Sequence, residues 1–181
     1  MAYLWAWDDD PDPMIDRPVG LRQANENTDV FLVEALLVAV YEKTAKRPVP
    51  VLPIPGTAWG DLEDAYIADF QTFIVRQRKP TGIVSPIPPS MHYHAAVTKK
   101  YTMAHLIQAA RIAVSYNEGS KLVPFLIKRF PFLKGPLGVI RNRQGVMPGE
   151  TGMIEQVGGG GTESGTHSRS DHDPLPSGMA L

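Results

Sequence analysis

The sequence predicts an all-α fold: a small three-helix module extended by one or two C-terminal helices, set between an arm and a flexible tail. Two observations predict this class. Four segments repeat apolar residues every three or four positions, which is the spacing of a buried helix face. The chain of 181 residues also contains 17 Pro and 16 Gly, concentrated between these segments, and neither residue suits the interior of a strand. We therefore expect helices joined by Pro-rich crossings, without a sheet.

Residues 1–27 are expected to form an extended arm, because the run from Asp8 to Pro18 has too many turn-forming residues for a helix. Trp5 and Trp7 lie on this arm. Exposed indoles usually cover neighbouring apolar surface, so these two are predicted to pack against the domain or to dock a partner rather than to stack on a ligand.

The first helix is expected over about residues 29–46 and the second over about 61–78. Asp29 suits the positive amino end of the first helix, and Arg76 and Arg78 suit the negative end of the second. Between them, four prolines over 48–55 force an extended crossing that ends in a Gly56 turn. The apolar face of the first helix comprises Val30, Val33, Leu36, Leu37, Val40 and Tyr41.

Two further helices are expected over about 102–116 and 120–129, where apolar residues again recur at helical spacing. The helical domain is therefore predicted to span residues 28–134. Residues 135–181 contain little to bury and many glycines and prolines, so they are predicted to be a flexible tail.

Several short motifs together carry a resemblance to a known family. They are Pro18-Val19-Gly20, Asp29-Val30-x-x-Val33-Glu34-x-x-Leu37, Ala65-Tyr66-Ile67-Ala68-Asp69-Phe70-Gln71 and Pro80-Thr81-Gly82-Ile83-Val84-Ser85-Pro86. In this order they resemble the peptidoglycan-binding-like domain over residues about 18–90. That family has a Gly-rich start, a helix with Val-Gln-x-x-Leu, a Thr-led helix ending in Phe-Gln, and an Asp-Gly-x-Val-Gly-Pro turn. The resemblance implies a non-catalytic module that binds cell-wall polymer.

The chain departs from the family pattern at Glu34, Glu63, Thr81 and Ser85, and at the turn of Gly56 it lacks the family's Asp and has one extra residue before Gly60. At the four substituted positions the family has Gln, Thr, Asp and Gly, respectively. These changes alter groups that would shape the ligand-facing loops, so the pattern supports the fold better than the binding activity. The residues expected to form the hub of the packed helices are Val33, Leu37, Phe70 and Val84.

The candidate ligand-binding residues lie in the loop before the second helix and in the turn after it: Gly56, Thr57, Trp59, Gly60, Asp61 and Gly82. Whether this surface binds a sugar depends on the exposure of Trp59. An exposed indole stacks on a sugar face, whereas a Trp after a Pro-rich crossing is more often a core plug. Both interpretations remain open from the sequence.

No catalytic or metal site is predicted. His92 and His94 supply only two ligands, and the His, Ser and Asp residues of 167–173 lie in the predicted tail, which cannot hold a triad. The absence of Cys removes disulfides and thiolate chemistry. We expect a non-enzymatic protein without cofactors.

Charge and hydropathy limit the classes of partner that the chain is expected to bind. Residues 29–140 carry thirteen basic and eight acidic residues, a net +5, while residues 1–28 carry two and six, a net −4. A slightly basic core suits an anionic polymer, but the overall balance does not predict nucleic-acid binding. No stretch predicts membrane insertion, and no signal peptide is recognisable, so synthesis in the cytoplasm is expected, with a virion or exported particle as a route to the wall.

The sequence therefore favours two functions. The first is recognition of peptidoglycan or a similar polymer, as the resemblance implies. The alternative is a structural or adaptor subunit of a phage tail or of a contractile injection or secretion particle, which would use the same fold for contacts with neighbouring subunits.

Overall fold

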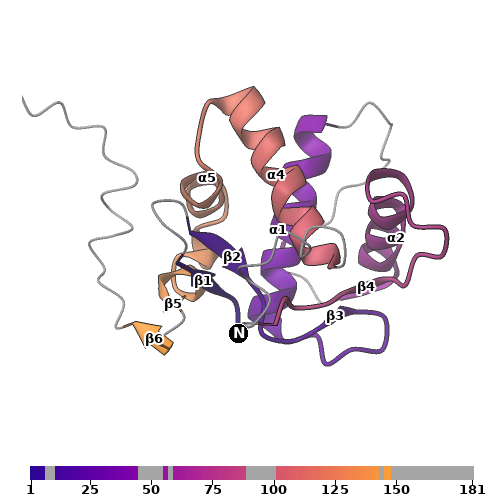
Figure 1. Cartoon of the computed structure of the whole chain (residues 1–181), viewed down its shortest axis with the longest axis horizontal. Helices are drawn as coiled ribbons and strands as arrows, with labels where there is room; N and C mark the ends of the chain where they lie inside the picture. Colours follow the sequence, from indigo (N-terminus) through magenta and orange to yellow (C-terminus); the bar gives the residue numbers. More distant parts are fainter. Residues whose placement is uncertain (7–10, 45–54, 57–58, 89–100, 143–144, 148–181) are drawn as a thin grey trace, which may run out of the picture.

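The computed structural model describes residues 1–6, 11–44, 55–56, 59–88, 101–142 and 145–147 (Figure 1). Thr57, Trp7, His92, His94 and residues 148–181 lie outside this part of the chain. The described elements, in chain order, are β1 (Tyr3–Trp5), β2 (Asp12–Met14), β3 (Val19–Gly20), α1 (Asn27–Thr44), α2 (Asp61–Asp69), the π-helix η1 (Phe70–Ile74), β4 (Ile83–Val84), α4 (Thr102–Glu118), α5 (Leu122–Arg129), the 3-10 turns η3 (Pro131–Leu133) and η4 (Pro136–Gly138), β5 (Ile140–Asn142) and β6 (Gly145–Met147).

Helix α1 is the central element of the fold. Every residue from Leu32 to Tyr41 is buried, so the helix is covered on all sides rather than along one stripe. A helix that is apolar all round requires such cover, and α4, α2, β2, β3 and η3 supply it (Figure 1). The predicted hub is confirmed to the extent that Val33, Leu37, Phe70 and Val84 are all buried in one core cluster.

The second helical segment begins where predicted and ends earlier. At its start the Glu63 carboxylate accepts a hydrogen bond of 2.9 Å from the backbone N–H of Gly60. From Phe70 the α-helix widens into η1, and Arg76 then takes a left-handed conformation with φ of 61°. Left-handed backbone cannot continue a right-handed helix, so the segment ends at Ile74 rather than at the predicted Arg78.

Helices α4 and α5 lie close to the predicted ranges. Gly119 ends α4 in the left-handed region, with φ of 60°, and its N–H donates to the carbonyl of Ser115. Phe130 follows α5, and Pro131 then opens η3.

The all-α prediction is wrong, because the described residues also form two small sheets. One has the strand order β2-β1-β5-β6, with β1 antiparallel to β2 and parallel to β5. The other pairs β3 with β4. Strands of two or three residues are too short for an alternating pattern to be seen, and β1 pairs with a strand from the other end of the described chain, Leu4 opposite Ile140.

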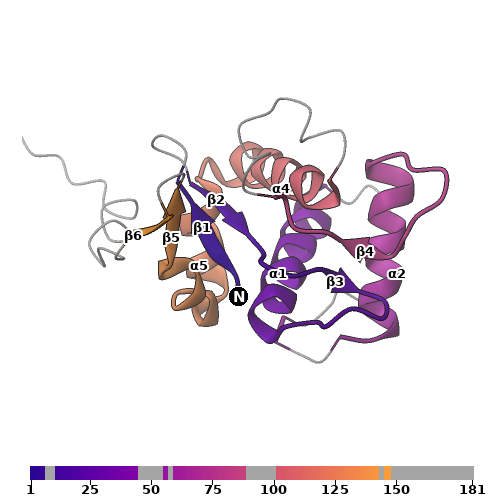
Figure 2. The same cartoon turned by 60° about the horizontal axis from the view of Figure 1, so that its bottom comes forward.

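The segments expected to be an arm and the beginning of a tail supply this four-stranded sheet. Residues 1–27 contain β1, β2 and β3, and residues 135–147 contain η4, β5 and β6 (Figure 2). Trp5 is only 4% exposed and belongs to the core cluster. Its ring therefore packs against the domain and leaves little surface for a partner.

The β3–β4 pair depends on Gly20. Its φ is 133°, and a Cβ built there would lie 2.1 Å from the carbonyl oxygen of Gly82. The two strands can approach in this register only because residue 20 has no side chain.

We predict that Gly20→Ala destabilises the fold by roughly 2–4 kcal/mol, because the new methyl group both clashes with Gly82 and strains the backbone. Chemical denaturation followed by circular dichroism measures the change. The control is Gly135→Ala, at a position with φ of −64° and open space around the added methyl group. That variant is expected to be neutral or slightly stabilising, and equal losses in both variants would contradict the role of Gly20.

Candidate functional site

Hydrogen bonds from two side-chain amides and the backbone hold two turns together. One follows β3 and the other precedes β4; residues 20–25 and 76–83 are called the paired turns below. The backbone N–H of Leu21 donates to the carbonyl of Gly82 across them, at 3.3 Å. Figure 2 shows both turns at the α2 end of the molecule.

Gln71 fixes the second of these turns from inside the protein. Its side chain is buried, and its carbonyl oxygen accepts hydrogen bonds from the backbone N–H groups of Thr81 and Gly82, at 2.8 and 2.9 Å. Its amide nitrogen donates to the carbonyl of Ile83 at 2.9 Å, and lies within hydrogen-bond distance of the Thr81 and Thr102 hydroxyls. Both lone pairs of the oxygen and both hydrogens of the nitrogen are thus used.

Asn25 fixes the first turn in a similar way. Its side-chain oxygen accepts from the N–H of Gly20 at 2.9 Å, and its amide nitrogen donates to the Gly20 carbonyl at 3.1 Å. The residue has a positive φ of 47°, which asparagine tolerates better than most residues. Asn25 was not among the predicted site residues, although an Asn a few residues after a glycine is typical of a turn.

Two arginines of the paired turns also have left-handed backbone, Arg22 with φ of 59° and Arg76 with φ of 61°. This conformation costs a residue other than glycine about 1 kcal/mol. Both side chains are exposed. Leu21 beside them is 52% exposed, so the surface combines apolar and cationic groups.

The loop before α2 is built differently. Trp59 is half-buried against the core, and its indole N–H donates to the Asp64 carboxylate at 2.6 Å. Gly56 has a φ of 98°, and its N–H donates to the buried Glu34 carboxylate at 2.8 Å. This arrangement favours the core-plug interpretation of Trp59, since the ring is half-buried against the core and its N–H bond to Asp64 holds it there.

The structure separates the predicted site residues into two groups. Gly56, Trp59, Gly60 and the exposed Asp61 lie at the amino end of α2. Gly82 is bound to Gln71, ten residues further along the helical segment, which corresponds to roughly 15 Å of helix rise.

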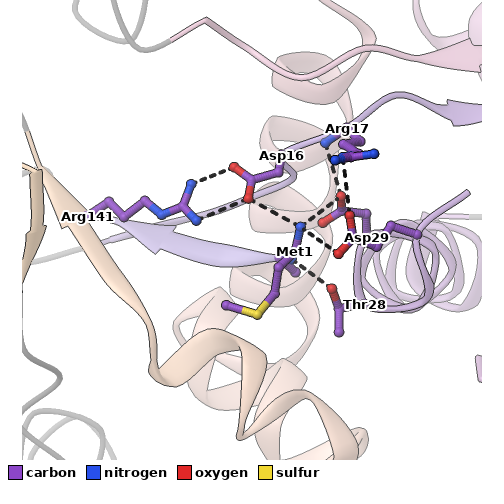
Figure 3. Close-up of polar contacts among 8 residues, drawn as sticks. Met1, Asp16, Arg17, Thr28, Asp29 and Arg141 are labelled. Atoms are coloured by element: carbon purple, nitrogen blue, oxygen red, sulfur yellow. Dashed lines mark hydrogen bonds and ion pairs between the residues drawn. The ribbon is translucent and has the colours of Figure 1, made fainter. Parts of the chain in front are cut away.

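A second polar cluster joins the beginning of β1 to α1 and β5 (Figure 3). The Met1 ammonium lies 3.2 Å from Asp16 and 3.3 Å from the buried Asp29. Asp29 also accepts from the backbone N–H of Arg17 at 3.0 Å, and Arg141 binds Asp16 through both terminal nitrogens. The Arg141 guanidinium also lies over the ring of Tyr3, 4.0 Å from its centroid.

The pKa values in this cluster shift in opposite directions. Burial raises the pKa of Asp29, and the Arg17 N–H and Met1 ammonium offset only part of that effect. Burial would also raise the pKa of Asp16, but hydrogen bonds from Arg141 and the Met1 ammonium outweigh it, so this pKa is lowered. Every group of the cluster bonds to another part of the same chain, which indicates a structural role.

Within the described ranges, no three His, Asp or Glu side chains are grouped so that they could hold a metal ion. No described helix is both long and apolar enough to cross a membrane.

Comparison with known proteins gives no match: no family model, no curated protein and no solved structure is significantly similar to the chain.

We predict that Gln71→Leu destabilises the protein by roughly 2–4 kcal/mol, because the N–H groups of Thr81 and Gly82 lose their acceptor. Denaturant unfolding gives the free energy. The matched control is Gln108→Leu on the exposed side of α4, expected to change stability by less than about 0.5 kcal/mol. A Gln71→Leu variant as stable as the wild type would contradict the proposal that the Gln71 amide stabilises the turn before β4.

We also predict that Arg141→Met lowers stability at pH 7 by about 1 kcal/mol and that this difference from wild type becomes smaller in acid. Because the folded-state pKa of Asp16 is lowered, its stabilisation is present above the unfolded value of 3.8 and is lost as pH falls through the lower folded value. Unfolding at pH 7 and below pH 3 measures both. Arg78→Met, at an exposed residue, should show no such pH-dependent difference. A difference that persists unchanged in acid would contradict the Asp16–Arg141 pairing.

Proposed function

We propose that this protein is a non-catalytic module that binds peptidoglycan or a similar cell-wall polymer. One observation carries the proposal. The two segments that resemble the peptidoglycan-binding-like domain most closely, 65–71 and 80–86, meet through the amide of Gln71. Gly20, from the Pro18-Val19-Gly20 motif, contacts the same turn. The residues of the pattern thus act on one another, which supports an architectural origin for their spacing.

The paired turns are the proposed binding surface. Their backbone is held by Gln71 and Asn25, so a ligand does not have to order it on binding. Leu21 presents an apolar side chain beside Gly82, where the absence of a side chain exposes the backbone. The Trp59 loop becomes the less favoured surface because the indole ring is half-buried against the core, which leaves less of its face for stacking.

A second function, as a structural or adaptor subunit, is favoured by a separate feature. Ile112 and Tyr116 are 59% and 89% exposed and lie four residues apart on α4, so they share a face. Binding of a polymer at the paired turns leaves this apolar face unused. A subunit of a larger particle would use such a face against a neighbour.

We predict that the protein sediments with purified peptidoglycan in a saturable manner and that Leu21→Asp weakens this binding at least about tenfold, because a charge replaces the apolar contact. The matched control is Ile112→Asp, which makes the same change at an exposed residue of α4 and should bind as wild type does. Thermal unfolding checks that both variants fold.

Absence of sedimentation by the wild type would contradict the first function. If light scattering then shows an oligomer that Ile112→Asp dissociates, the second function is supported. Equal loss of binding in both variants would mean that the paired turns are not the binding surface.

A further inference from the structure

The described arginines divide into two groups by whether they have an acidic partner. Four form ion pairs, Arg17 with Glu26, Arg111 with Asp12, Arg129 with Glu42 and Arg141 with Asp16. The other three are Arg22, Arg76 and Arg78, and the described part of the chain offers them no ion pair.

All three of these arginines belong to the paired turns. Arg22 follows Leu21, whose N–H donates to Gly82, and Arg76 and Arg78 lie on the stretch that leads to Gly82 from the other side. In both Figure 1 and Figure 2 these two stretches lie at the same end of the molecule, beside α2. Lys79 adds a fourth exposed cation, and no acidic residue occurs anywhere between Phe70 and Pro88.

The backbone at two of these positions adds an independent argument. Asn25, the third described non-glycine residue with positive φ, uses its side chain to bind Gly20. Arg22 and Arg76 have the same unfavourable conformation, yet their side chains are exposed. Glycine would take this backbone without strain. Strained residues whose side chains do nothing for the fold point to a role outside it.

We propose that Arg22, Arg76 and Arg78 form a binding surface for carboxylate groups, and that the ligand is a carboxylate-bearing wall polymer, recognised through its peptide stems rather than through its sugars. This deepens the function proposed above and rests on it. A guanidinium binds a carboxylate through two parallel hydrogen bonds, and three such groups along two adjoining turns suit several carboxylates on one extended chain. Leu21, which is exposed beside Gly82, contacts the apolar part of such a stem.

Two double variants test this inference, because they remove the same charge at different places. Arg76→Asn with Arg78→Gln removes two arginines of the paired turns, and asparagine tolerates the left-handed backbone at position 76. Arg17→Gln with Arg129→Gln removes two arginines that are largely exposed and ion-paired. Arg78→Glu alone serves as a third variant that leaves position 76 intact.

The proteins are titrated with three probes: intact peptidoglycan, glycan strands from which an amidase has removed the peptide stems, and soluble poly-L-glutamate. We expect the wild type to prefer intact peptidoglycan to bare glycan, with binding that weakens as salt is added. The paired-turn variant and Arg78→Glu should each bind at least about tenfold more weakly, while the control double variant stays at the wild-type affinity.

The outcomes separate this inference from the proposed function. Equal binding of intact and bare glycan, or equal losses in the two double variants, overturns the carboxylate surface while leaving wall binding in place. If the wild type does not bind peptidoglycan, the proposed function is wrong, and binding of poly-L-glutamate then tests the carboxylate surface by itself. Binding of poly-L-glutamate that the paired-turn variant loses supports the surface, and no binding overturns it.

Discussion

The amide of Gln71 connects three elements that are far apart in the chain. It lies at the end of the second helical segment, binds the turn before β4, and lies within hydrogen-bond distance of Thr102 at the start of α4. Inside a protein, an unsatisfied amide costs far more than a satisfied one gains, so the turn and the helix ends must meet at this residue. Glutamate would lack the donors, leucine would lack both donors and acceptor, and asparagine would be one carbon shorter.

Other parts of the molecule are held by packing and by polar contacts away from Gln71. α1 is apolar on all sides and needs cover on each, which α2 and α4 provide in part and the strands complete. β1 brings the first described residues against β5 near the end of the described chain, and Arg141 ties β5 to Asp16. The four-stranded sheet is thus held by side-chain polar contacts as well as by its own short ladders. Because strands of three residues provide few ladder bonds, these contacts matter more than they would in a longer sheet.

The helices and the buried hub could be predicted from the sequence, because helical periodicity is local and α1, α2, α4 and α5 each show it. The sheets could not. β1 has three residues and a partner near the other end of the described chain, and Pro13 in β2 is a signal against a strand, although an edge strand tolerates it. Part of the candidate site could also be predicted from the sequence. Gly20, Gln71 and Gly82 belong to the motifs of the sequence. The bonds of Asn25 to Gly20 depend on the conformation of the turn, and the grouping of unpaired arginines depends on which carboxylates lie nearby in space.

The paired turns combine a fixed backbone with long exposed side chains, and this combination affects how tightly they bind a ligand. Backbone that is already fixed by buried amides contributes to binding without first losing conformational freedom, whereas the long arginine side chains lose freedom when they bind. Gln71 and Asn25 fix the backbone, and Arg22, Arg76 and Arg78 extend from it as exposed side chains. Each single contact should therefore be weak, and binding should become strong only when one ligand offers several anionic groups. A repeating polymer meets that requirement, and a small molecule with one carboxylate does not.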